Sequence, residues 1–405
     1  MSALRTSAVG AVAAARRERL LGRVPEFPLL AGSWVAALLI LASIVAYYTI
    51  KPNAYDLSII SSGIHQFLHH ANVYRAAGWG RYLHPPSSLL LLAPLGLVDF
   101  DHIRVPYLIA ETAAIAAGVL LSLRLIRVPA ASVTGGAAII LAGISAPVIE
   151  ELRWSNVDGM VLPLVVGSLI AIDRKRDLTA GFLLGVALAF KPTAAPLLLV
   201  PLLWGRWRTL SVAVALPAML FVAGSALLVH PLDFITVTVP VLVSGLGHDL
   251  IGGNLAIAAV GSWIGAPSAV TLLVRLAVLA AAVLAVRSAY RRSEQTTDQL
   301  LLLSGLILVT ADLVPAYSYI RYLIYLVPIF AWLLLVRRGM PGLIGAAGLA
   351  CMLVPYSPAL DAHFWIVGQL DLFRFSAGAA AVFVALVVAS LPAREGRAGA
   401  PAPAA

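Results

Sequence analysis

Residues Leu178–Trp204 read LTAGFLLGVALAFKPTAAPLLLVPLLW, an apolar stretch that Lys191 and Pro192 interrupt near its middle. A lysine at bilayer depth is costly, and a chain keeps one there only where it lines a polar cavity or a site. The proline after it breaks the helix. The stretch therefore predicts two membrane segments, or one re-entrant hairpin, that meet at a polar apex.

The composition of the whole chain has the same character. Of its 405 residues, 61% are hydrophobic and 12% are charged, which excludes a water-soluble globule. The formal net charge of +9 comes from short basic clusters between apolar runs, and not from a stripe of the kind that binds nucleic acid. The single cysteine, Cys351, excludes an intrachain disulfide and a cysteine metal site.

The basic clusters predict the orientation of the chain, because such clusters stay on the cytoplasmic side of a membrane. Between them the sequence predicts about twelve transmembrane or re-entrant segments, several of them shorter than the usual ~20 residues. They lie near 30–50, 103–126, 131–149, 157–172, 178–190, 192–204, 209–229, 268–287, 299–313, 320–336, 341–355 and 375–391.

The expected fold is an all-α polytopic helical bundle in the plasma membrane, with both termini in the cytoplasm. Residues 1–391 would form one transmembrane domain, and the Gly-, Pro- and Ala-rich tail 392–405 is expected to be disordered. The orientation places a long loop, residues 51–102, on the extracytoplasmic side.

Polar side chains gather on that extracytoplasmic side. The loop contains Asp56 just after the first apolar segment, and it contains most of the histidines. A transporter would be expected to place ionisable residues in mid-membrane between internal repeats, and no repeats are recognisable. Polar chemistry at one membrane face favours an enzyme that acts on a lipid-linked substrate.

Five short motifs follow one another along the chain: Asn53–Leu57 (NAYDL), Tyr82–Pro86 (YLHPP), Ser155–Gly159 (SNVDG), Gly185–Pro192 (GVALAFKP) and Gly252–Leu255 (GGNL). Together they resemble glycosyltransferase family 87 (the DUF2029 proteins), within the GT-C class of integral-membrane glycosyltransferases. The last motif is similar to the AftC-type arabinofuranosyltransferases. Pro315–Tyr322 has tyrosines where many polyprenyl-phosphate-mannose-dependent mannosyltransferases have paired histidines.

The resemblance implies an inverting glycosyltransferase that takes a glycosyl residue, arabinofuranosyl by preference, from a polyprenyl-phosphate donor. The acceptor would be a cell-envelope glycan or glycolipid on the extracytoplasmic face, and neither a cofactor nor a metal is implied. A mannosyl donor is the alternative within the class. A non-catalytic transporter or flippase of lipid-linked sugars is the alternative from another class.

Asp56 would be the general base that removes the proton of the acceptor hydroxyl. Lys191 and Arg321 would neutralise the leaving phosphate. The further candidates for binding the donor are His84, Asn156, Asp158, Asn254 and Tyr317.

Each of these residues also has an ordinary structural interpretation. Asp56 could be a solvated loop acid, and the two cations could be anchors at the membrane interface. Asparagine and aspartate often cap helices. His65, His69 and His70 have helical spacing, which fits the polar face of an interfacial helix better than a metal site.

Overall fold

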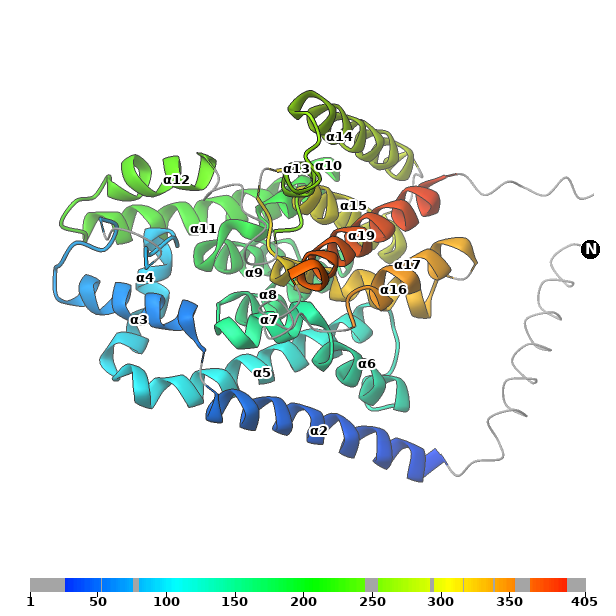
Figure 1. Ribbon diagram of the computed structural model, residues 1–405, viewed down its shortest axis with the longest axis horizontal. Coiled ribbons are helices and arrows are strands. Elements are labelled where there is room, and N and C mark those ends of the chain that lie inside the picture. Colours follow the sequence, from blue (N-terminus) through cyan, green and yellow to red (C-terminus); the bar gives the residue numbers. More distant parts are fainter. Residues whose placement is uncertain are drawn as a thin grey trace, which may run out of the picture.

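The structure is a computed structural model, and it describes residues 26–391 apart from residues 52, 76–79, 245–253, 292–294, 316, 338 and 354–364. Within these described residues the regular elements are helices, and the one β-bridge pairs Asn254 with Tyr319. The helices pack into a single bundle (Figure 1), which confirms the expected all-α fold.

Of the described helices, five are long and apolar enough to cross a membrane. They are α2 (Glu26–Ile50), α5 (Phe100–Leu125), α11 (Trp207–Ala226), α14 (Ser268–Tyr290) and α19 (Trp365–Ser390). A sixth candidate is the pair α6 (Val133–Gly143) and α7 (Ala146–Trp154), which is bent by 60°. A polytopic membrane bundle is therefore confirmed, whereas the count of about twelve segments stays a prediction.

Prolines set two of the breaks between helices. Pro192 confines the residue before it to an extended conformation, and Lys191 has φ −158° and ψ 126°. Helix α9 (Asp177–Phe190) therefore ends where the sequence predicted a break, and η2 (Pro192–Leu198) and α10 (Leu199–Leu203) follow it.

The second break lies inside a predicted segment. One transmembrane or re-entrant segment was predicted near 131–149, and within it α6 ends at Gly143 and α7 begins at Ala146. Pro147 lies in the first turn of α7, where its missing N–H would have had no helical partner. It therefore starts a new helix in a new direction.

Helix α8 (Asp158–Asp173) lies at the centre of the bundle. It packs against α5 on one side and α9 on the other, and α11 covers α9. A Cβ on Gly181 of α9 would lie 2.7 Å from the carbonyl oxygen of Thr209, so the glycine allows α9 and α11 to approach closely. Asp158 and Gly159, at the start of α8, are buried.

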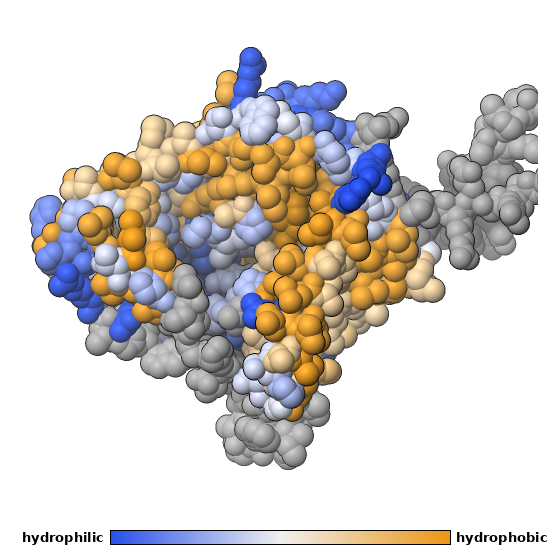
Figure 2. Space-filling model, turned by 90° about the horizontal axis from the view of Figure 1, so that it is seen from above, coloured by the Kyte–Doolittle hydropathy of each residue, from blue (hydrophilic) through white to orange (hydrophobic). Residues whose placement is uncertain are grey.

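The outermost helices present apolar side chains to the surroundings. In the most apolar 18-residue stretch of each helix, 6% of the residues are buried in α2 and 11% in α14, compared with 50% in α5. Such surfaces are expected where lipid surrounds a helix. Figure 2 shows extensive hydrophobic surface around a recess in which more hydrophilic residues are visible.

The remaining elements complete the walls around the centre. They are η3 (Phe234–Thr238), α12 (Val239–Ser244), α13 (Ile257–Trp263), α15 (Thr297–Leu313), η4 (Ile320–Leu326), α16 (Val327–Leu335) and α17 (Met340–Ala350). Helix α15 buries all of its leucines, although it is shorter than a full membrane crossing.

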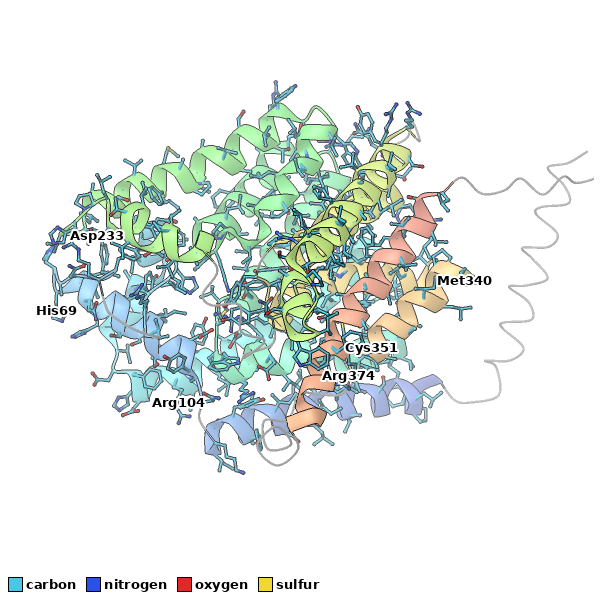
Figure 3. All side chains as sticks on the ribbon, turned by 45° about the horizontal axis from the view of Figure 1, so that its top comes forward. His69, Arg104, Asp233, Met340, Cys351 and Arg374 are labelled. Atoms are coloured by element: carbon cyan, nitrogen blue, oxygen red, sulfur yellow. The ribbon has the colours of Figure 1, made fainter. Side chains whose placement is uncertain are left out.

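The predicted loop 51–102 is a folded cover. It contains α3 (Tyr55–Leu68), α4 (Pro86–Leu92) and η1 (Ala93–Leu97), with α3 packed on η1 and α4 packed on α11. Arg75 joins the cover to the chain before η3, because its Nε lies 2.8 Å from Asp233 Oδ2. His69 and Asp233 mark this end of the molecule in Figure 3. Asp56 stands in the first turn of the cover.

Candidate active site

Five polar side chains from four parts of the chain meet next to the start of α8. Asp56 comes from the first turn of α3, Asn156 from the turn between α7 and α8, and Asp158 is the first residue of α8. Lys191 comes from the break after α9, and Arg321 from η4. We call these five residues the polar cluster. The sequence predicted each of them as a site residue, and the fold brings all five together.

Asp56 has two partners at the same oxygen, an ion pair with Arg321 and a hydrogen bond from Asn156. Arg321 Nη1 lies 3.0 Å from Asp56 Oδ2, and the side-chain amide of Asn156 donates a hydrogen bond to that same atom. Among the described residues no donor reaches Asp56 Oδ1. The carboxylate is thus held in place by one oxygen while the other stays available.

Asp158 and Lys191 form a buried ion pair. Lys191 Nζ lies 2.5 Å from Asp158 Oδ2 and also donates to Asn156 Oδ1 at 3.0 Å. The Asp158 side chain is completely buried, and the Lys191 side chain is 9% exposed. Tyr325 donates to Asp158 Oδ1 at 2.6 Å, so both carboxylate oxygens have partners. Such pairing is needed to keep a charge inside a protein.

Arg321 lies between the two carboxylates and a group of aromatic rings. Its Nε is 3.9 Å from Asp158 Oδ2, while its Nη1 bonds Asp56. Its guanidinium carbon lies 4.2 Å from the centre of the Tyr319 ring, and Lys191 Nζ lies 4.8 Å from the centre of the Tyr322 ring. Cation–π contacts of this kind hold cations without neutralising them.

Local backbone features fix the turn that carries Asn156. Ser155 has a left-handed φ of 50° where α7 ends, and Asn156 Oδ1 accepts from the backbone N–H of Val157 at 2.7 Å. The hydroxyl of Tyr107 donates to the Asn156 carbonyl at 2.7 Å. Ala54 donates its backbone N–H to the Arg153 carbonyl at 3.0 Å, which joins the start of α3 to the same turn.

His84 is buried beside the polar cluster, and its Nδ1 has no hydrogen-bond partner among the described residues. Burial is the main cause that lowers the pKa of His84 to about 4, and the positive charge of Lys191 adds to it against the opposite effect of Asp56. The imidazole is therefore neutral at neutral pH. It can offer one nitrogen as an acceptor to a bound hydroxyl.

The lowered pKa of His84 predicts that the stability of the folded protein depends on pH. Because an unfolded histidine has a pKa near ~6.5 and His84 one of about 4, the unfolded chain binds more protons between these values. The contribution of His84 to stability should therefore be fully present above about pH 6.5 and should be lost as the pH is lowered toward about 4.

We expect His84→Gln, which cannot titrate, to flatten this fall in the melting temperature of the purified protein. His102→Gln is the matched control, since the His102 side chain is 79% exposed. An unchanged pH dependence in His84→Gln would contradict the assignment.

Asn254 and Tyr317 are near the polar cluster but do not join it through the contacts seen. Asn254 Oδ1 accepts from the backbone N–H groups of Ser318 and Ala256, at 3.0 Å and 3.1 Å. These bonds hold the segment that leads into η4 and Arg321. The ring of Tyr317 packs on that of Tyr319, with the two centres 4.5 Å apart. Their predicted contact with a donor sugar stays a prediction.

Two other histidines of the cover pack on each other at the end of α3. The rings of His65 and His69, which follows the last residue of α3, are 4.2 Å apart. In the described part of the chain no group of three or more His, Cys, Asp or Glu is arranged to hold a metal ion.

Sequence reasoning missed several partners of the cluster. Tyr325 and Thr193 both reach Asp158 Oδ1, and Glu151 and Glu111 are buried close to Asp158. A signal existed for Glu111, which is the one charged residue between Arg104 and Arg124 in the predicted segment 103–126. No comparable signal marks Tyr325, one of four tyrosines between residues 317 and 325.

The fold and the polar cluster define the class of protein. It is a helical membrane protein that holds carboxylates, a lysine and an arginine in one small buried site. Comparison of the sequence with protein families gives the family, because residues 82–315 match glycosyltransferase family 87. The chain belongs to this family. The match includes five of the predicted site residues (His84, Asn156, Asp158, Lys191 and Asn254), and it begins after Asp56 and ends before Arg321.

Individual relatives agree with the family. The chain is 31% identical over 276 residues to an alpha-(1->3)-arabinofuranosyltransferase of Mycobacterium tuberculosis, covering 66% of this chain and 63% of that protein. It is 30% identical over 279 residues to the protein of the same name from Mycolicibacterium smegmatis, covering 67% and 64%. A Corynebacterium glutamicum protein of that name is 26% identical over 230 residues, covering 55% and 54%. The matches thus span less than two thirds of the relatives' length.

Proposed function

We propose that this protein is an inverting glycosyltransferase that transfers an arabinofuranosyl residue from a polyprenyl-phosphate donor. The acceptor is a hydroxyl group of a cell-envelope glycan or glycolipid at the extracytoplasmic face. The observation that carries the proposal is the position of Asp56, whose carboxylate is fixed by Arg321 and Asn156 within a site that also holds Lys191. The named relatives support the choice of sugar.

The proposed reaction is a single displacement at C1 of the donor sugar. The acceptor oxygen attacks C1 of the donor sugar, its proton passes to Asp56, and a new glycosidic bond forms. The bond between C1 and the phosphate oxygen breaks, and the polyprenyl phosphate leaves with the electron pair. The configuration at C1 inverts, because attack and departure take place on opposite faces.

The two cations suit the charge that develops on the leaving phosphate. Arg321 presents a planar set of donors that matches phosphate oxygens, whereas Lys191 acts as a point charge. Both now bond carboxylates, at 3.0 Å for Arg321 to Asp56 and 2.5 Å for Lys191 to Asp158. In this proposal the phosphate takes over part of the ion pairing of Arg321, which leaves Asp56 more basic when the acceptor arrives.

A comparison of donors tests this proposal against its two alternatives. Purified protein in lipid would be given arabinofuranosyl and mannosyl polyprenyl phosphates with a glycan acceptor. We expect transfer from the arabinofuranosyl donor. Preference for the mannosyl donor would assign mannose, and not arabinofuranose, as the transferred sugar. Movement of the intact lipid across the membrane without transfer would identify a flippase.

The orientation in the membrane is tested by labelling cysteines from outside. His69 and Arg174 are both exposed, and they lie at the end of α3 and just after α8. On a Cys351→Ala background, we expect an impermeant thiol reagent to label His69→Cys in intact cells. Arg174→Cys should react only after the membrane is permeabilised. The reverse pattern would overturn the proposed orientation and move the site to the cytoplasmic face.

A further inference from the structure

Two buried carboxyl groups lie next to the polar cluster and take no part in the proposed step. Glu111 stands midway along α5 and Glu151 on α7, and both side chains are completely buried. Glu151 Oε1 accepts from the backbone N–H of Gly159 at 2.8 Å. Its Oε2 and both oxygens of Glu111 meet no hydrogen-bond donor among the described residues.

The two carboxyl groups face one another beside Gly159. A Cβ on Gly159 would lie 2.8 Å from Glu111 Cγ and 3.1 Å from Glu111 Oε1, so a larger residue here would displace the Glu111 side chain. Ionised carboxylates are acceptors only, and contact between two of them satisfies neither. One proton placed between them turns this contact into a hydrogen bond.

The charge of the surroundings favours that proton. The groups that face the pair are Asp56 from α3, Tyr107 from α5, Asp158 from α8, Lys191 and Arg321. With every acid ionised, four carboxylates would stand against two cations. A site with that excess of negative charge would repel a phosphate, and uncompensated buried charge is itself costly.

We propose that Glu111 and Glu151 share one proton and act as positioning residues for Asp158. The hydroxyl of Glu111 donates to Glu151 Oε2, and Glu151 Oε1 holds the Gly159 N–H in the first turn of α8. This fixes Asp158 against Lys191. The presence of the shared proton does not depend on the proposed function, whereas its effect on sugar transfer rests on that function.

Infrared difference spectroscopy of the full-length protein in lipid tests for the proton directly. A protonated carboxylic acid has a carbonyl stretching band that a carboxylate lacks. We expect this band to be lost in Glu111→Gln and also in Glu151→Gln, which serves if the first variant does not fold. Asp99→Asn, at a side chain that is 92% exposed, should keep the band. A band that survives in both glutamine variants overturns the proposal.

Turnover then tests the positioning role. Glu111→Gln supplies an N–H donor to Glu151 and should keep turnover within about threefold, while Glu111→Leu leaves a buried acceptor unpaired and should lose about tenfold or more. Wild-type turnover should fall at alkaline pH as the shared proton leaves, and Glu111→Gln should lack this fall. Equal losses in the two variants, or an unchanged alkaline fall, would overturn the role. Absence of transfer by the wild type would contradict the proposed function but not the shared proton, since the spectra need no substrate.

Discussion

Replacing Asp56 with asparagine is expected to lower the rate of sugar transfer by about 10²–10⁴-fold while leaving the protein folded. The amide keeps the size of the side chain but cannot take up the proton of the acceptor hydroxyl. Its oxygen can still accept the hydrogen bond that Asn156 donates to the native carboxylate. The fold around the site should therefore survive.

Steady-state kinetics distinguish two roles of Asp56, that of a general base and that of a simple counter-ion of Arg321. Loss of the base should reduce kcat with little change in KM for the donor, because the proton moves only in the transition state. Loss of a counter-ion would instead change KM, since Arg321 would then be free to bind phosphate. Asp99→Asn removes an exposed acid from the same cover and should behave as wild type. Retention of more than about a tenth of the activity by Asp56→Asn would assign the base to another group.

The fold was predictable wherever a local rule determines it. The Lys191-Pro192 break depends on the geometry of one proline, and the structure has it. The number of membrane crossings depends on packing instead. Helix α15 has 17 residues, and most of them, including every leucine, are buried by neighbouring helices. Length and hydropathy alone therefore cannot say whether it spans the bilayer.

The members of the site were predictable because charged residues in apolar surroundings are conspicuous. Their pairing was not. Asp158 was predicted to bind the donor, which stays a prediction, and the sequence did not indicate that its buried side chain bonds Lys191 and Tyr325. Which acid meets which cation follows from how α8 packs against α9, and a single sequence does not contain that register. Asn254 likewise bonds the backbone of a segment 64 residues away, which no local pattern indicates.

Replacing Lys191 with methionine should lower turnover by about 10²–10³-fold, the range found when a group that stabilises transition-state charge is removed. Methionine keeps most of the apolar stem and removes the charge. If Lys191 holds the leaving phosphate, turnover should fall more than donor affinity, because the interaction strengthens as charge builds on the phosphate. A lysine that only anchors the chain at the interface would tolerate methionine with turnover near that of wild type.

The ion pair with Asp158 complicates this single change. Lys191→Met leaves the fully buried Asp158 carboxylate with Arg321 Nε, 3.9 Å away, as its nearest cation. An uncompensated buried charge destabilises a protein whatever its catalytic role. A loss of activity in the single variant could therefore come from a displaced α8.

The double variant Asp158→Asn with Lys191→Met resolves the two causes, because it removes both charges together. We expect its melting temperature to recover toward that of wild type, while turnover stays as low as in Lys191→Met. That result would show that the site needs the lysine charge for the reaction itself. Recovery of turnover together with stability would instead make Lys191 a structural partner of Asp158, and the role of binding the leaving phosphate would pass to Arg321 alone.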